Sequence, residues 1–318
     1  MNTHKVIFDT DPGVDDALAL YYLIRHPQIQ LLGVTTVFGN APVTLTTRNA
    51  RFLLRSWGAD VPVHAGAAAA ITPDMPDESF PVHIHGENGM GDIDIPDAPV
   101  EEADTAAQFI IDQVRAHPGK VRILAVGRMT NLARALQIDP EIADLVGDVV
   151  IMGGAFRVAG NITPAAEANI WGDPLAADRV FGADWHVTAI PLDLTTRTMI
   201  GRRELQALAD KGGEGMQLVA DLSQDYIGFY AQSGYDGMVI HDCCAAVFLT
   251  DPDLFRLTHG QVRVLWQGIA LGLTIMNPQD RKGPMGAWDD LPVQAYASDG
   301  DVDQIIARIG EICTAVNG

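Results

Sequence analysis

The 318-residue sequence predicts an α/β fold, with an open and mostly parallel central sheet flanked by helices in a Rossmann-like arrangement. The first observation behind this prediction is the alternation of short apolar runs with helix-like segments, which is typical of parallel strands joined by crossover helices. The second is that polar residues gather directly after the apolar runs. Since ligands bind at the carboxyl ends of strands in such sheets, we expect the active site there. No linker, repeat or low-complexity tract interrupts the pattern, so we interpret 1–318 as one domain.

The first expected strand and helix hold an unusual cluster of acidic residues. Val6-Ile7-Phe8 is typical of a buried strand, and the apolar spacing over 14–21 is typical of a helix. Four carboxylates lie around their junction: Asp9, Asp11, Asp15 and Asp16. Helix capping and a charged first turn explain one or two of these groups. Four would repel one another unless a positive charge lay among them, and hard oxygen ligands suit Ca²⁺ or Mg²⁺.

The elements that follow are predicted from apolar periodicity and β-branched content. In chain order, they are strand 30–38, helix 44–57, strand 61–64, helix 104–117, strand 120–126, helix 130–137, strand 148–152, helix 175–181 and strand 186–191. Periodicity is lost over 66–103, which is rich in Pro, Asp and Gly. A structureless stretch of this length inside a compact domain predicts a functional loop or lid.

The last third of the chain changes character. Apolar spacing predicts helices at 202–209, 217–232, 243–249 and 302–315. Three short runs are predicted as strands, at 255–258, 262–266 and 270–274. His241-Asp242 directly precedes the predicted helix 243–249. Asp242 thus lies far along the chain from the acidic cluster at 9–16.

Composition limits the classes of partner. The net charge is −20, which disfavours nucleic acid and acidic membrane surfaces and is compatible with a metal cation or a neutral small molecule. The three cysteines (Cys243, Cys244 and Cys313) match neither a disulfide framework nor a zinc spacing. The chain enters a strand by Val6 and has no run of ~18 apolar residues. We therefore expect a cytoplasmic protein with no membrane partner.

Several motifs resemble those of the inosine–uridine-preferring nucleoside hydrolases. DTDPGVDDALAL at 9–20 is similar to the N-terminal signature of that family. Further motifs occur in the family's order: Phe38-Gly39-Asn40, HGENGMGD from His85, Thr130–Ala133, VVIMGGA from Val149, Gly160-Asn161, Glu167–Asn169, Asp193–Thr195 and His241-Asp242. The resemblance spans about three quarters of the chain, from 9 to 242.

This resemblance implies a Ca²⁺-dependent enzyme that splits the N-glycosidic bond of ribonucleosides to give ribose and a free base. Asp11, Asp16 and Asp242 would bind Ca²⁺ through carboxylates, and the backbone carbonyl of Val126 would be a further ligand. Asp11 would also be the general base. Ca²⁺ accepts more oxygens than these, so water and sugar hydroxyls can complete its shell. Attack of a metal-held water on C1′ of an oxocarbenium-like ribose predicts inversion.

The resemblance also implies a substrate-binding set. Asp15 would accept from the 2′-hydroxyl, while Asn169 and Asp242 would bind the 3′ side. Asn161 and Glu167 would bind the 5′-hydroxyl. The remaining members are Asn40 and Met152 near the sugar, His85 on a mobile loop near the base, and Tyr226 and Tyr230 as stacking partners of the base. Turn chemistry is the alternative for the Asn and Glu residues, a solvent-exposed position for His85, and core packing for at least one tyrosine.

His241 would be the proton donor to the leaving base or a contact to its edge, with a structural hydrogen bond as the alternative. Two positions depart from the family pattern. Arg128 stands beside the expected Ca²⁺ ligand where a small residue or proline is usual, so it would either repel the metal or point to solvent. Cys243 follows Asp242 where proline is common and is interpreted as a small buried apolar residue.

Two other functions are compatible with parts of this sequence. The Asp-x-Asp pair at Asp9 and Asp11 also suggests a haloacid-dehalogenase-type phosphatase, but Gly13 stands where that family has Thr or Val. A non-catalytic nucleoside- or ribose-binding protein with the metal site retained is the second alternative. No Gly-x-Gly-x-x-Gly follows a strand, which argues against a dinucleotide enzyme. The family implies a homo-oligomer, dimer or tetramer, acting in purine or pyrimidine salvage or nucleoside catabolism. The sequence does not identify the base.

Overall fold

A nine-stranded sheet forms the centre of the molecule in the computed structural model, which describes residues 3–75, 80–96, 104–232, 234–281 and 286–315. The strand order is β10-β9-β11-β6-β5-β4-β1-β2-β3. The strands span β1 (His4–Thr10), β2 (Ile29–Thr36), β3 (Val63–Ala65), β4 (Val121–Ala125), β5 (Asp148–Met152), β6 (Val187–Ile190), β9 (Phe255–Val264), β10 (Thr274–Pro278) and β11 (Val293–Gly300). The pairings along the order from β3 to β11 are all parallel, and β9 pairs antiparallel with both β11 and β10. The predicted open, mostly parallel sheet is confirmed.

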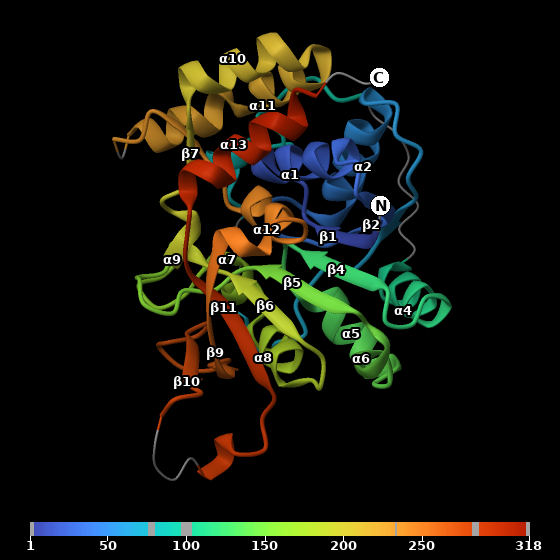
Figure 1. Cartoon of the computed structure of the whole chain (residues 1–318), viewed down its shortest axis with the longest axis vertical. Helices are drawn as coiled ribbons and strands as arrows, with labels where there is room; N and C mark the ends of the chain where they lie inside the picture. Colours follow the sequence, from blue (N-terminus) through green and yellow to red (C-terminus); the bar gives the residue numbers. More distant parts are fainter. Residues whose placement is uncertain (1–2, 76–79, 97–103, 233, 282–285, 316–318) are drawn as a thin grey trace.

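Helices cover both faces of this sheet (Figure 1). One core cluster includes side chains of α1 (Val14–Arg25), α2 (Val43–Ser56), α11 (Glu214–Ala231), α12 (Asp242–Phe248) and α13 (Val302–Cys313). The other includes side chains of α4 (Ala106–Ala116), α5 (Thr130–Ile138), α6 (Ile142–Leu145) and α8 (Pro174–Gly182). In β1, Val6 and Phe8 belong to the first cluster and Ile7 to the second. The unbroken apolar run of this strand follows from burial on both faces.

Shorter elements complete the described chain. They are α3 (Val82–His85), α7 (Ala168–Gly172), α9 (Leu192–Thr195), α10 (Arg202–Gly212), the 3-10 turns Pro252–Leu254 and Gly286–Trp288, and an antiparallel pair of β7 (Met199–Gly201) and β8 (Gly237–Val239). The stretch 66–103 is therefore not wholly irregular, since α3 lies within it; 76–79 and 97–103 lie outside the described residues.

The sequence-based strand assignment near the C-terminus is wrong in three respects. Runs 255–258 and 262–266 belong to the single strand β9, because the polar residues between them pair with β10 and β11 instead of forming a turn. Run 270–274 is not a strand: Gly268 and Gly272 both have a φ of +81°, which marks turns, and β10 begins only at Thr274. β11 was not predicted, since its sequence VQAYASDG has little β-branched content.

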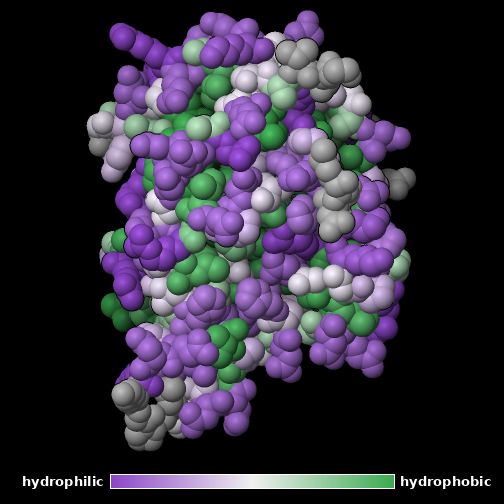
Figure 2. Space-filling model, in the orientation of Figure 1, coloured by the Kyte–Doolittle hydropathy of each residue, from purple (hydrophilic) through white to green (hydrophobic). Residues whose placement is uncertain are grey.

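The molecular surface in the orientation of Figure 2 is mostly hydrophilic, with apolar residues in interrupted patches. Within the part of the chain that the structure describes, no helix has both the length and the apolar content needed to cross a bilayer.

Candidate active site

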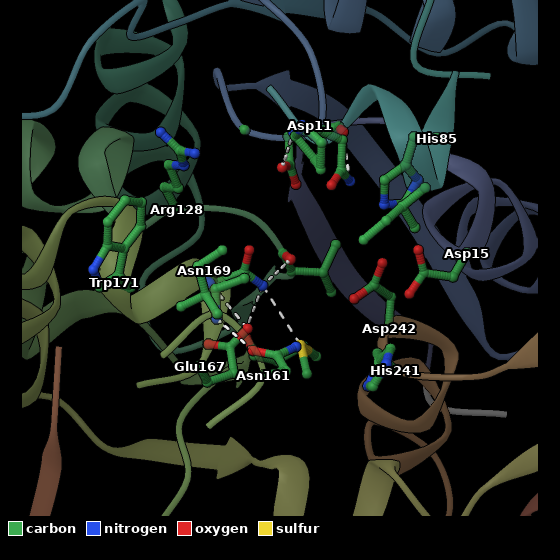
Figure 3. A pocket seen from close by; sticks show the side chains of 18 of the residues that line it. Asp11, Asp15, His85, Arg128, Asn161, Glu167, Asn169, Trp171, His241 and Asp242 are labelled. Atoms are coloured by element: carbon green, nitrogen blue, oxygen red, sulfur yellow. Dashed lines mark hydrogen bonds between the residues drawn. The ribbon is translucent and has the colours of Figure 1, made fainter. Parts of the chain in front are cut away.

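A cavity of about 310 Å³ opens at the carboxyl edge of the sheet, within the ~300–1,000 Å³ range of small-molecule sites. It is lined by residues that follow or end β1, β2, β4 and β5, such as Asp11, Asn40, Val126 and Met152. All of the predicted site residues except Asp16 line it: Asp11, Asp15, Asn40, His85, Val126, Met152, Asn161, Glu167, Asn169, Tyr226, Tyr230, His241 and Asp242. The topology thus brings residues from positions 11 to 242 to one cavity (Figure 3).

Buried carboxylates form one wall of this cavity. Asp15 and Asp16 lie in the first turn of α1, and Asp242 is the first residue of α12, which packs against α1. One carboxylate oxygen from each of these three residues lies within 4.8 Å of the other two. Asp11 is 2% exposed and points into the same space. The fold therefore concentrates negative charge where water cannot screen it.

Asn40 holds two of these acids in place. Its backbone N–H donates to Asp11 Oδ2 at 2.8 Å, and its Nδ2 donates to Asp16 Oδ2 at 3.0 Å. Asp16 also accepts from Thr10 Oγ1 at 2.5 Å and from the backbone N–H of Gly13 at 2.9 Å, so it is buried behind the cavity lining. Asp11 Oδ1 is buried, and among the described atoms it has no hydrogen-bond partner. One buried acceptor atom of the acidic wall thus has no donor among the described residues.

The electrostatics of the wall fit a divalent cation. Burial, followed by repulsion from Asp16, raises the pKa of Asp11 well above its usual value, and the same two causes raise the pKa of Asp15 to about 8. Burial and then Asp15, Asp16 and Asp11 raise the pKa of Asp242. A cation among these carboxylates would keep them ionised. Oxygen donors of this kind suit Ca²⁺ or Mg²⁺, and the acidic cluster can hold a metal ion.

Asp9 is not a member of this acidic wall, contrary to its sequence-based grouping with Asp11. Since side chains alternate along a strand, Asp9 lies on the same side of β1 as Ile7, toward α5. Its Oδ2 accepts from Thr35 Oγ1 at 2.6 Å and from Asn131 Nδ2 at 2.8 Å. The fourth carboxylate of the wall comes from Asp242 instead.

An amide-rich group lies across the cavity from the acids (Figure 3). Glu167, which is 2% exposed, caps α7 by accepting from the backbone N–H groups of Asn169 at 2.9 Å and Ile170 at 3.1 Å. Asn169 Nδ2 donates to the Val126 carbonyl at 2.6 Å. Asn161 Oδ1 accepts from the backbone N–H of Ala168 at 3.0 Å. Glu167 therefore has a local structural role, as its turn-chemistry alternative expects, and it also lines the cavity.

Aromatic and imidazole rings form the remaining side. His241 Nδ1 lies 2.9 Å from Thr195 Oγ1, and its Nε2 lies 3.3 Å from the Tyr230 hydroxyl. The Tyr226 hydroxyl donates to the Val239 carbonyl at 3.1 Å, and its ring belongs to the core as well as to the cavity. Burial lowers the pKa of His241 to about 4, so its imidazole is neutral at pH 7.

His85 is buried, so the solvent-exposed alternative is wrong. Its ring is 6% exposed, and Nδ1 accepts from the backbone N–H of Val14, the first residue of α1, at 3.3 Å. Burial, with smaller contributions from His241 and His83, lowers the pKa of His85 to about 3. An accepting Nδ1 leaves the proton of the neutral ring on Nε2.

Sequence reasoning missed several lining residues, namely Gly39, Pro81, His83, Ile84, Ile162, Ala168 and Trp171. Ile84 and Trp171 give no local signal, because an apolar residue in a helix is usually part of a core. Arg128 was noted only as a departure. It is 4% exposed and lines the cavity, so it does not point to solvent.

The open, mostly parallel sheet and the acidic, amide-rich cavity at its carboxyl edge are typical of an α/β enzyme with a candidate metal site. The model of the family described as "Inosine-uridine preferring nucleoside hydrolase" matches residues 6–307, and the chain belongs to this family of enzymes. It is 40% identical to uridine nucleosidase 1 of Arabidopsis thaliana, over 86% of this chain and 82% of the relative. It is 34% identical to the inosine-uridine preferring nucleoside hydrolase of Leishmania major, over 86% and 87% of the two chains.

Solved structures agree with this assignment. A plant nucleoside hydrolase superposes with a TM-score of 0.92 at 32% identity, covering 98% of this chain and 99% of the other. A purine-preferring ribonucleoside hydrolase from Gardnerella vaginalis superposes with a TM-score of 0.87 at 34% identity, with the same coverage. The predicted family, fold and enzyme class are confirmed, and the phosphatase and non-catalytic alternatives are not favoured.

Proposed function

We propose that this chain hydrolyses the N-glycosidic bond of ribonucleosides to ribose and free base, with Ca²⁺ as its cofactor. One observation carries the proposal. Carboxylates from α1 and α12 share a buried cavity with the amide-rich residues of α7, and one acceptor atom, Asp11 Oδ1, has no partner among the described atoms. Carboxylates suited to a cation and amide groups suited to sugar hydroxyls thus line the same cavity of about 310 Å³.

Asp11, Asp16, Asp242 and the Val126 carbonyl are the groups that would hold the cation, with Asp15 next to them. When bound, the cation supplies positive charge that keeps the carboxylates ionised and makes water easier to deprotonate. The Val126 carbonyl already faces the cavity, where it accepts from Asn169 Nδ2. Asp16 would need no rearrangement of its support, since Thr10, Gly13 and Asn40 already orient it.

Asp11 is the proposed general base. Its Oδ2 is held by the Asn40 backbone N–H, which leaves Oδ1 to take a proton from the attacking water. Attack on C1′ from the acidic side, opposite the departing base, inverts the configuration. Asp15 would accept from the 2′-hydroxyl, and Asn169 and Asp242 would bind the 3′ side.

The other sugar contacts follow from the same orientation. Asn161 and Glu167 would bind the 5′-hydroxyl, and Asn40 and Met152 would lie against the ribose. These groups line a single cavity, so a ribose bound there would be oriented before reaction, which lowers the entropic part of the barrier.

The leaving base would lie against His241, Tyr230, Tyr226 and His85. His241, held between Thr195 and Tyr230, would donate a hydrogen bond to the base as the glycosidic bond breaks, and in its imidazolium form it would donate a proton. The Nε2–H of His85 is a second donor on this side. Both groups would neutralise charge that develops on the leaving base.

Release of reducing sugar from a nucleoside panel tests the proposal. Relatives are named for uridine, for inosine and uridine, and for purines, so we propose uridine and inosine as the first substrates, with cytidine, adenosine and guanosine beside them. The expected result is turnover that a chelator abolishes and Ca²⁺ restores. Nucleoside binding without sugar release would instead support the non-catalytic alternative.

We further propose a single domain, a dimeric or tetrameric assembly, and a cytoplasmic role in nucleoside salvage or catabolism. The family resemblance supports these points. Light scattering of the purified chain tests the assembly, and a monomer at micromolar concentration would contradict it.

A further inference from the structure

Arg128 lies at the junction of three segments that build the cavity. It belongs to the turn between β4 and α5 that also carries Val126, and it lines the cavity while being only 4% exposed. Figure 3 places it beside Trp171, on the side away from His85. Among the described lining residues it is the only arginine or lysine.

The first neighbour of Arg128 is the segment that follows β2. The guanidinium carbon lies 4.2 Å from the centroid of the Phe38 ring, a cation–π contact between two buried side chains. Phe38 is two residues before Asn40, whose backbone and side chain orient Asp11 and Asp16. A shift of Phe38 would therefore move the group that positions the proposed base.

The second neighbour is α7. A Cβ atom built on Gly172 would lie 2.2 Å from Arg128 Nε and 2.6 Å from its Cδ. Only a residue without a side chain leaves the Arg128 side chain this space. Gly172 is the last residue of the helix that carries Asn169, which donates to the Val126 carbonyl. The groove for Arg128 is thus part of the sugar-binding side.

We infer that Arg128 is a positioning residue for the hydrolytic reaction: packed between Phe38 and Gly172, it sets the spacing between the Asn40 side and the Asn169 side of the cavity. Its planar guanidinium stacks on the ring and its stem fills the groove, a combination that lysine does not reproduce. The inference rests on the proposed function of this cavity.

Four variants test the inference: Arg128→Met, Arg128→Lys, Gly172→Ala and the double variant Arg128→Met with Gly172→Ala. Gly172→Ala leaves every charge in place and disturbs only the space that Arg128 occupies. We expect kcat/KM to fall by about 10- to 100-fold in Arg128→Met and in Gly172→Ala, with kcat falling and KM rising. Arg128→Lys should recover only part of the loss. The double variant should be no worse than Arg128→Met, because the two changes act on one contact.

Two matched controls accompany them. Gly182→Ala adds a Cβ in another helix with nothing within 4 Å, and Arg55→Met removes an exposed arginine. Neither should change kcat or KM. A second readout is the rise in melting temperature on adding Ca²⁺ to chelator-treated protein, which should be smaller in Gly172→Ala than in the wild type.

Wild-type kcat and KM in both Arg128→Met and Gly172→Ala would overturn the inference. Losses of kcat/KM that multiply in the double variant would also overturn it. A lower melting temperature with unchanged kinetics would indicate a purely structural role and would overturn it as well. Failure of the proposed function looks different, since the wild-type chain itself would then release no sugar. In that case the Ca²⁺-induced change in melting temperature still decides the inference, and an equal rise in Gly172→Ala and wild type would overturn it.

Discussion

The backbone of Gly39 lies against the carboxylate of Asp11, so closely that a Cβ atom at position 39 would be 1.8 Å from Asp11 Oδ2. The next residue donates its backbone N–H to that same oxygen. The proposed base is therefore held by main chain on one side, and glycine at position 39 is the condition for this approach. The arrangement satisfies Oδ2 and leaves Oδ1 without a hydrogen-bond partner among the described atoms.

Gly39→Ala is expected to lower kcat by at least about 100-fold, equivalent to ~2.7 kcal/mol in the barrier, because Asp11 must turn away from its Asn40 donor. Steady-state kinetics on the best nucleoside of the panel would measure it. Gly182→Ala serves as the control. Retention of wild-type kcat in Gly39→Ala would show that this contact does not position the base.

Asp11→Asn should abolish turnover while leaving the fold intact. Asparagine keeps the shape and the acceptor for Asn40, but it cannot take a proton. It also removes one of several buried carboxylates that burial and mutual repulsion destabilise, so the melting temperature of the chelator-treated protein should not fall. The exposed Asp184→Asn is the matched control. An active Asp11→Asn enzyme would remove Asp11 from the mechanism.

Metal removal should lower stability as well as activity. A ligand bound only by the folded state adds about 2.7 kcal/mol to stability at a concentration of 100 Kd. Exhaustive chelation is therefore expected to lower the melting temperature and to stop sugar release, and added Ca²⁺ should restore both. A melting curve that chelation leaves unchanged would count against a tight metal site.

The pair formed by His186 and Asp148 predicts a pH-dependent stability at the opposite end of the sheet. A hydrogen bond to Asp148, at 3.1 Å, raises the pKa of His186 above its usual value. Although burial raises the pKa of Asp148, hydrogen bonds from His186 and Arg122 outweigh it and leave that pKa lowered. The His186 contribution is complete below its unfolded pKa of about 6.5 and disappears as pH rises through the higher folded pKa.

The Asp148 contribution has the opposite sign. It is present above the unfolded pKa of about 3.9 and is lost as pH falls through the lower folded pKa. His186→Gln should therefore lower the melting temperature at pH 5.5 and not at pH 8.5. The effect should be small, below about 1 kcal/mol, because the His186 side chain is 55% exposed. The exposed His259→Gln is the control, and an equal loss at both pH values would contradict the prediction.

The local parts of this enzyme can be predicted from the amino-acid sequence alone. The apolar run of β1, the acidic first turn of α1 and the ordered motifs from 9 to 242 were sufficient to predict the fold class and the family, and to list candidate residues that share one cavity. These features are short-range: a strand buried on both faces must be apolar throughout, and residues one turn apart in a helix lie together whatever surrounds them.

The local pattern of the chain does not reveal which acids meet, because that depends on how distant elements pack. Asp9 and Asp11 are two residues apart, yet Asp9 faces Asn131 of α5, while Asp242 reaches the cavity because α12 packs on α1. Partners distant in the chain likewise place three other features. These are the hydrogen bond from the Val14 N–H to His85, the space that Gly172 leaves for Arg128, and the strand β11. Packing between elements places these side chains. The periodicity of a single segment does not indicate which distant residues will pack against it.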